Sequence, residues 1–122
     1  MKKIILVLCV SLLFASCTTV KNIPEDLTAA QLIQKGQDSL VAGQYSNAET
    51  YLKTAIQRFG DDPATYVEVR YELANLYYKS HKKAEAAAMY QEIIDMYDSV
   101  DYGTLPTAYK RLAEIGLQKL SK

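Results

Sequence analysis

Residues 32–59 read LIQKGQDSLVAGQYSNAETYLKTAIQRF, and the spacing of their small and large apolar residues returns once further along the chain. The second half of this stretch carries an apolar ladder at positions i, i+4, i+7 and i+11, formed by Ala48, Leu52, Ala55 and Phe59. Thirty-eight residues later the same ladder reads Ala86, Tyr90, Ile93 and Tyr97. A helical ladder that repeats at one offset predicts stacked helical hairpins, and therefore an all-α array.

Boundary signals predict the first three helices. Thr28 to Gln31 has the spacing of a capping box and predicts a helix over residues 29–42, which Gly43 ends. Ser46 to Glu49 repeats that spacing and predicts a second capping box, opening a helix that ends near Phe59. Asp62 as N-cap and Pro63 at the first helical position predict a third helix that ends near Lys79.

The remaining chain predicts two more helices, which makes five in all. Residues 80–82 are expected to form a turn, after which a fourth helix continues to about Tyr97. Residues 98–103 are expected to form a loop, and Thr104-Leu105-Pro106 to begin a fifth helix ending near Leu120. Small residues recur where paired helices are expected to cross, because close approach requires one partner without a bulky side chain. These are Gly36, Ala48, Ala55, Ala74 and Ala86.

Composition argues against nucleic-acid binding and against catalysis. The 122 residues suffice for one small domain, and fourteen basic residues balance fourteen acidic ones. His81 is the only histidine and falls in a predicted turn, so neither a metal site nor a Ser-His-Asp relay is expected, and no cofactor. Asp61 and Asp62 are explained by the N-cap before Pro63. Glu85, Glu92 and Asp95 are expected to be solvated charges on a polar helix face.

The amino terminus has the three-part layout of a bacterial secretory signal. Two lysines after Met1 are followed by about eleven mostly apolar residues, Ile4 to Phe14, and then by small residues up to Cys17. The apolar run is shorter than the roughly twenty residues of a comfortable membrane-spanning helix. Residues 1–16 are therefore expected to be a cleaved signal peptide. Two alternatives remain, namely an ordinary signal cut near Ala15 and an uncleaved anchor.

The stretch Leu13-Phe14-Ala15-Ser16-Cys17 resembles the lipobox of bacterial lipoproteins, with phenylalanine where leucine is commonest. The resemblance implies that Cys17 becomes the first mature residue and carries a diacylglycerol, which anchors the chain to a membrane. Cys9 leaves with the signal, so no second thiol remains to pair with Cys17. Thr18 is not the aspartate that retains some lipoproteins at the inner membrane. The expected location is thus the bacterial cell envelope, at the outer membrane facing the periplasm, with residues 17–27 as lipidated cysteine and tether and 28–122 as helical domain.

The helical region resembles the tetratricopeptide repeat family. In the first repeat, Leu32, Gly36, Gly43, Tyr45, Ala48, Leu52 and Ala55 follow the order and spacing of the family signature. In the second, Leu73, Ala74, Tyr77, Ala86 and Tyr90 do so, with His81 where glycine is usual. Leu112-Ala113 falls in a final helix that looks like the first half of a third repeat, which gives about two and a half repeats, each about four residues longer than usual. A lipobox with lengthened repeats also looks like the periplasmic lipoproteins of outer-membrane assembly and maintenance, the BamD type among them.

The family resemblance implies that the first helix of each hairpin lines a concave face that binds a protein or peptide. Tyr71, Asn75 and Tyr78 fall on one helical stripe, so two aromatic side chains flank an amide. The alternative is that both tyrosines pack within the array. The family's carboxylate-clamp pattern is not met, since Ile33 and Gln37 stand at its positions. The full set of expected concave residues is Ile33, Gln37, Leu40, Val41, Tyr71, Asn75, Tyr78, Lys79, Lys110, Glu114 and Leu117.

The sequence therefore predicts a lipid-anchored interaction module that binds another envelope protein. A rival hypothesis is a structural subunit that completes its helical stack with another chain, as a homo- or hetero-oligomer, because short arrays often need further repeats for stability. An enzyme acting on peptidoglycan is disfavoured, because no catalytic constellation is visible in the sequence.

Overall fold

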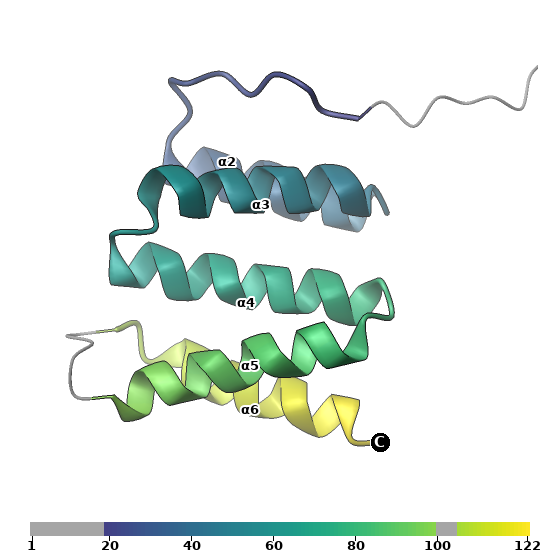
Figure 1. Cartoon of the computed structure of the whole chain (residues 1–122), viewed down its shortest axis with the longest axis vertical. Helices are drawn as coiled ribbons and strands as arrows, with labels where there is room; N and C mark the ends of the chain where they lie inside the picture. Colours follow the sequence, from purple (N-terminus) through teal and green to yellow (C-terminus); the bar gives the residue numbers. More distant parts are fainter. Residues whose placement is uncertain (1–18, 100–104) are drawn as a thin grey trace, which may run out of the picture.

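The computed structural model describes residues 19–99 and 105–122, which form five antiparallel helices (Figure 1). They are α2 (Ala29–Val41), α3 (Tyr45–Phe59), α4 (Pro63–Lys79), α5 (Lys83–Asp98) and α6 (Ala108–Leu120). Helix α2 pairs with α3 and α4 pairs with α5, while α6 packs on α5. Helix α4 also contacts α2 and α6, so α2, α4 and α6 form one layer and α3 and α5 the other. The predicted all-α array of two and a half hairpins is confirmed.

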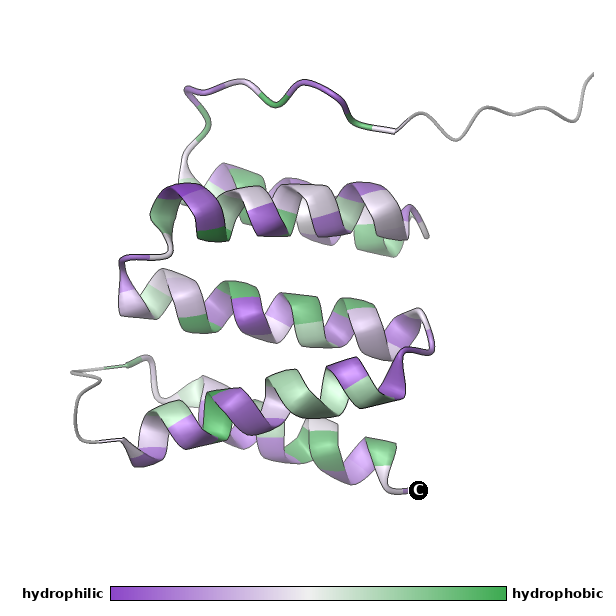
Figure 2. Cartoon of the chain, in the orientation of Figure 1, coloured by the Kyte–Doolittle hydropathy of each residue, from purple (hydrophilic) through white to green (hydrophobic). Residues whose placement is uncertain are grey.

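The repeated apolar ladder forms part of the core. Ala48, Leu52 and Ala55 of the first ladder are fully buried, as are Ala86 and Ile93 of the second, and Tyr90 is only 2% exposed. In Figure 2 each helix carries both hydrophobic and hydrophilic residues, as expected of helices that bury one side. All the side chains that build this core, including those packed at its edge, come from residues 23–120.

Two of the three predicted helix starts that rest on caps are confirmed. Thr28 and Gln31 form the expected capping box. The Asp62 carboxylate accepts a hydrogen bond from the Thr65 backbone N–H at 2.9 Å. The capping box at Ser46 is wrong, because α3 already begins at Tyr45, and its N-cap Gln44 makes no side-chain capping bond. Glu49 instead pairs with Lys53 at 2.7 Å, one turn along the same helix.

The predicted start of the last helix is also wrong. Helix α6 begins at Ala108 and not at residues 104–106. Leu105 is 7% exposed and belongs to the core, and the Pro106 carbonyl accepts a hydrogen bond from the Tyr97 hydroxyl. These contacts hold residues 105–106 against the end of α5, so the helix starts only after them.

Glu92 is not the solvated charge that its helix face suggested. Its carboxylate accepts hydrogen bonds from the Tyr66 hydroxyl, at 2.8 Å, and from the Arg70 guanidinium. Arg70 also lies over the Tyr66 ring, 5.4 Å from its centroid. The three side chains form a polar bridge between α4 and α5. A carboxylate that receives two such donors is part of the helix pairing.

The two hairpin turns place a left-handed residue at the same repeat position. Gly43 has φ +74°, which glycine adopts without strain, and His81, thirty-eight residues on, has φ +62°. The turns therefore have one backbone shape. The second turn carries a side chain where that shape favours glycine.

Residues 19–27, expected to be a tether, lie against the array. The Val20 N–H donates to Asn47 Oδ1 at 3.0 Å, and Arg58 donates to the carbonyls of Ile23 and Pro24 at 3.1 and 2.7 Å. Ile23 and Leu27 pack on the core. The signal peptide and Cys17 lie outside the described residues. Within those residues, no helix has the length and apolar character needed to cross a bilayer.

Candidate protein-binding groove

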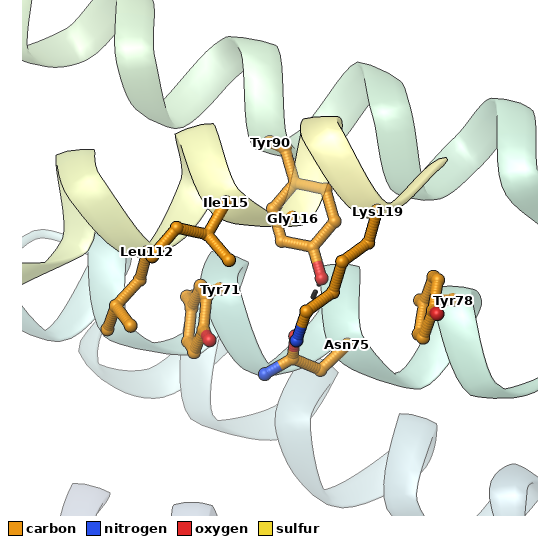
Figure 3. A pocket seen from close by; sticks show the side chains of 8 residues that line it. All are labelled: Tyr71, Asn75, Tyr78, Tyr90, Leu112, Ile115, Gly116 and Lys119. Atoms are coloured by element: carbon orange, nitrogen blue, oxygen red, sulfur yellow. Dashed lines mark hydrogen bonds between the residues drawn. The ribbon is translucent and has the colours of Figure 1, made fainter. Parts of the chain in front are cut away.

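The layer formed by α2, α4 and α6 is hollowed by a groove with a volume of about 360 Å³. It narrows between α4 and α6 into a pocket of about 100 Å³ (Figure 3). We call these two connected volumes the concave groove. Predicted site residues supply most of its wall, namely Gln37, Leu40, Val41, Tyr71, Asn75, Tyr78 and Lys79.

Tyr71 packs within the array and also borders the concave groove. Its ring centroid lies 6.2 Å from that of Tyr90 and 5.5 Å from that of Tyr109, both at tilted angles. The side chain is partly buried against the core. Tyr71 thus follows the packing alternative, and its main contribution is to join α4, α5 and α6.

Tyr78 lies open in the concave groove. Its side chain is 39% exposed, and in Figure 3 Tyr71 and Tyr78 stand on either side of Asn75. The two tyrosines that the helical stripe grouped together therefore differ in their surroundings. Only Tyr78 offers a free aromatic face to a ligand.

Asn75 is held in place from the outer layer. Tyr90 on α5 donates its hydroxyl hydrogen to Asn75 Oδ1 at 2.7 Å (Figure 3). Burial raises the pKa of Tyr90 to about 12, so the phenol keeps this proton at neutral pH. This hydrogen bond fixes the orientation of the amide, so its NH₂ group faces away from Tyr90 and into the groove (Figure 3). No other described residue hydrogen-bonds to that amide.

The floor of the concave groove holds a carboxylate. Gln37 on α2 donates to Glu72 Oε1 on α4 at 2.9 Å, which ties the first hairpin to the second. Burial raises the pKa of Glu72 above its ordinary value, while the hydrogen bond from Gln37 opposes that shift. The groove therefore combines a partly desolvated acidic group with the amide of Asn75 and the ring of Tyr78.

The other predicted site residues lie outside the concave groove. Ile33 borders a separate polar hollow of about 380 Å³ at the start of α2, which also reaches Gln37. Lys110 pairs with Asp98 at 2.5 Å, and Glu114 pairs with Arg111 at 3.3 Å. Leu117 packs on the core. A binding role for Ile33, Lys110 and Glu114 stays a prediction.

Sequence reasoning missed Lys119, which borders both parts of the concave groove. Extending the repeat offset into the last helix selected positions 110, 114 and 117, whereas α6 presents Leu112, Ile115 and Lys119. The predicted and observed groove faces of α6 differ by a rotation of the helix about its axis. Gly116 is the residue of the sequence that indicates this rotation. A glycine inside a helical pattern marks a close approach, here of the Tyr90 ring.

The sequence model of the tetratricopeptide repeat family matches residues 40–105, more than half of the chain. The chain belongs to the tetratricopeptide repeat family. The chain is also similar to an uncharacterized protein of Treponema pallidum (strain Nichols), with 28% identity over 106 residues. The aligned region covers 87% of this chain and 42% of that relative, so the chain spans less than half the relative's length. No solved structure matches it.

Membership of the tetratricopeptide repeat family indicates the general role of this fold. Such repeats are interaction scaffolds that bind protein partners, and they are typically not enzymes. No group of three or more His, Cys, Asp or Glu side chains gathers at one point in residues 19–99 and 105–122. The repeats of this chain therefore have the fold of a protein-interaction scaffold.

Proposed function

We propose that this tetratricopeptide repeat protein is a lipid-anchored module of the bacterial cell envelope that holds a segment of another envelope protein in its concave groove. The observation that carries the proposal is the wall formed by Tyr78, Asn75, Lys79 and Lys119 around one open volume. An open aromatic ring, a fixed amide and two lysines together suit a peptide and not a small apolar ligand.

Each of these groups has a distinct partner on a peptide. The NH₂ group of Asn75 donates to a backbone carbonyl, because the bond from Tyr90 to the amide oxygen holds the NH₂ group toward the groove. The ring of Tyr78 stacks on an apolar or aromatic side chain. Lys79 and Lys119 make no ion pair with another described residue, so both are available to an acidic group. We therefore propose an extended segment with an apolar residue next to an acidic one.

A matched pair of tyrosines tests the groove. Tyr78 and Tyr45 are both 39% exposed, but Tyr45 begins α3 in the outer layer and lies outside the concave groove. A photo-crosslinking amino acid at position 78 is expected to capture a partner in intact cells, and the same group at position 45 is not. In pull-downs from detergent extracts, Tyr78→Ala should lower partner recovery about tenfold, as loss of one aromatic contact predicts, while Tyr45→Ala leaves it unchanged. Equal recovery with both variants would refute the groove assignment.

The anchor is tested on the two cysteines of the chain. We propose that Cys17 carries the lipid, on the strength of the lipobox resemblance. Labelled palmitate is expected to enter the wild-type protein and the Cys9→Ser variant but not Cys17→Ser. Fractionation of the labelled cells then tests the outer membrane against the inner membrane. Label retained in Cys17→Ser would overturn the anchor, and crosslinks to proteins of the outer-membrane assembly or maintenance complexes would identify the class of partner.

A further inference from the structure

The exposed large apolar side chains of the described residues gather at one end of the array. Val41 is 84% exposed, and Tyr45 and Tyr78 are each 39% exposed. Val41 and Tyr45 flank the α2–α3 turn, and Tyr78 precedes the α4–α5 turn by one residue. Figure 1 shows both turns, and the end of α6, on the same side of the molecule. An apolar group of this size that faces water at one end of a small array calls for a physical explanation.

Lysines surround these apolar side chains. They come from the α4–α5 turn and from the last residues of the chain, and none makes an ion pair with another described residue. Acidic side chains near these turns are fewer, namely Asp38 and Glu85, since Glu49 is paired with Lys53. We call this region the basic end, and it consists of Val41, Tyr45, Tyr78, Lys79, Lys82, Lys83, Lys119 and Lys122.

The opposite end of the array has the opposite charge. There the chain carries Glu25, Asp26, Asp61, Asp62 and Asp98, against which stand Arg58, Lys110 and Arg111, the last paired with Glu114. Lys110 is neutralised by its ion pair with Asp98. Charge therefore changes sign along the helix axes. A negative surface would attract the basic end and repel the other, which fixes the orientation of the array as well as its position.

The amino-terminal segment leads to the same end. It runs back along α3 from the start of α2, held by Arg58 at one point and by Asn47 at the other (Figure 1). Asn47 is the third residue of α3, close to the α2–α3 turn. Val20 therefore lies near the basic end, and Cys17 is three residues before it in the sequence.

We propose that the basic end binds the surface of a bilayer that contains anionic phospholipid. The lysine ammonium groups lie among the headgroups, and Val41 and Tyr45 enter the interfacial layer above the acyl chains, while Tyr78 at its edge stays in the concave groove. Each lysine near an anionic surface raises partitioning about fivefold. This contact goes beyond the capture of a protein partner, and it does not require the lipid on Cys17.

Vesicle binding by the unlipidated chain is the first test. The chain without its first seventeen residues contains the whole described core and lacks the apolar leader and Cys17. It is expected to sediment with vesicles of phosphatidylglycerol and phosphatidylcholine, and to stay in solution with phosphatidylcholine alone. Replacing Lys79, Lys82 and Lys83 by glutamine should weaken partitioning by at least tenfold, toward about a hundredfold when all three lysines reach the surface.

The matched control removes three positive charges away from the basic end. Lys35→Gln, Lys110→Gln and Arg111→Gln in one chain give the same change of net charge, in the middle of α2 and at the start of α6. Partitioning of this variant should stay within about threefold of the parent chain, because the helix rise places these residues roughly 9 Å or more from the basic end, beyond a Debye length of about 8 Å. An equal loss in both triple variants would overturn the proposal. Binding to neutral vesicles, or the absence of binding to anionic ones, would do the same.

A single tryptophan gives a second readout of orientation, because the chain has none of its own. Val41→Trp is expected to be quenched by phospholipids brominated on their acyl chains, whereas Asp61→Trp at the opposite end is not. The Asp61 substitution removes a negative charge, so it could only strengthen binding to anionic vesicles. A lack of quenching at position 61 could therefore not be explained by weaker binding. Equal quenching at both positions, or none at position 41 in bound protein, would refute the assigned face.

The proposed membrane contact and the proposed partner groove can be refuted independently of each other. Vesicle assays contain no protein partner, and pull-downs from detergent extracts contain no bilayer. Tyr45→Ala separates the two directly, since Tyr45 belongs to the basic end but not to the concave groove. It should lower partitioning onto anionic vesicles several-fold and leave partner recovery unchanged. Unchanged vesicle partitioning in Tyr45→Ala would remove this side chain from the membrane contact, against the proposal.

Discussion

Gly116 has no room for a methyl group, and that contact gives a quantitative test of how the last helix is seated. A Cβ atom at this position would lie 2.4 Å from Tyr90 Cζ and 2.6 Å from each of its two Cε atoms. Carbon atoms in contact are normally about 3.5–4.0 Å apart, so the ring would have to move by about 1 Å or more. Tyr90 is 2% exposed, its ring borders Tyr71, and its hydroxyl is bound to Asn75. The ring therefore cannot move without breaking other contacts.

The magnitude follows from three terms for Gly116→Ala. Overpacking a core position costs about 1–3 kcal/mol. Loss of the hydrogen bond from Tyr90 to Asn75 costs about 1 kcal/mol. Alanine in a helix interior returns about 1 kcal/mol relative to glycine. We expect a net loss of about 1–3 kcal/mol in the free energy of unfolding, measured by urea denaturation followed by circular dichroism at 222 nm.

A double-mutant cycle isolates the clash from every other effect. Tyr90→Leu lacks the Cζ and Cε atoms that the new methyl group would strike, so Gly116→Ala in that background should be neutral or stabilise by up to about 1 kcal/mol. Tyr90→Phe keeps all three atoms and should leave the cost in place, which separates the ring from its hydroxyl. A Gly116→Ala variant as stable as the parent, or an equal cost in the leucine background, would refute the described seating of α6 on α5.

Three further predictions address the turns, the amino-terminal segment and the groove floor. His81→Gly should raise the free energy of unfolding by about 0.5–1 kcal/mol, because a residue with a side chain is strained at φ +62°. Gly43→Ala should lower it by about 1 kcal/mol for the same reason. Denaturation midpoints of the two variants that shift in the same direction would contradict this. Arg58→Gln should speed amide exchange in residues 19–27 and tryptic cleavage after Lys21, with Arg111→Gln as the unaffected control. Glu72→Gln should stabilise the protein at pH 7 by less than about 1 kcal/mol, since burial penalises the ionised carboxyl and solvent screens part of that penalty. This gain should be lost as pH falls through the pKa of Glu72, which is raised above 4.5, and a gain that persists below pH 4 would show another origin.

The sequence was most informative where one signal acts locally. Helix α4 has its predicted bounds because Asp62 and Pro63 specify the start, and the repeated ladder is buried because its period matches the helix. The Ser46 box failed although its spacing was right. The N-cap of α3 is Gln44, two residues before Ser46, and Glu49 is used by Lys53 and by the Tyr77 hydroxyl from α4. A local pattern cannot show that a partner from another helix competes for its acceptor.

The groove residues on α2 and α4 were predictable from the sequence, but those on α6 were not. Residues on α2 and α4 followed from helical spacing within repeats that match one another. The face of α6 did not, because Tyr109 packs on Tyr71 and the Tyr90 ring covers Gly116, and together they set its rotation. The docking of residues 19–27 was likewise hidden. It depends on Arg58, whose carbonyl partners lie 34 and 35 residues away.

The two hairpins use one backbone arrangement for different purposes, and a single substitution within the repeat explains how. In the first hairpin, Leu52 is fully buried beside Gly36 and contributes only apolar contact. Tyr90 takes that place in the second hairpin, and its hydroxyl extends through the array to orient Asn75 in the concave groove. An outer-layer helix thereby controls a group on the opposite, inner layer. The amide that faces the concave groove is thus fixed within the second hairpin, whereas the first hairpin holds the amino-terminal segment through Asn47 and Arg58.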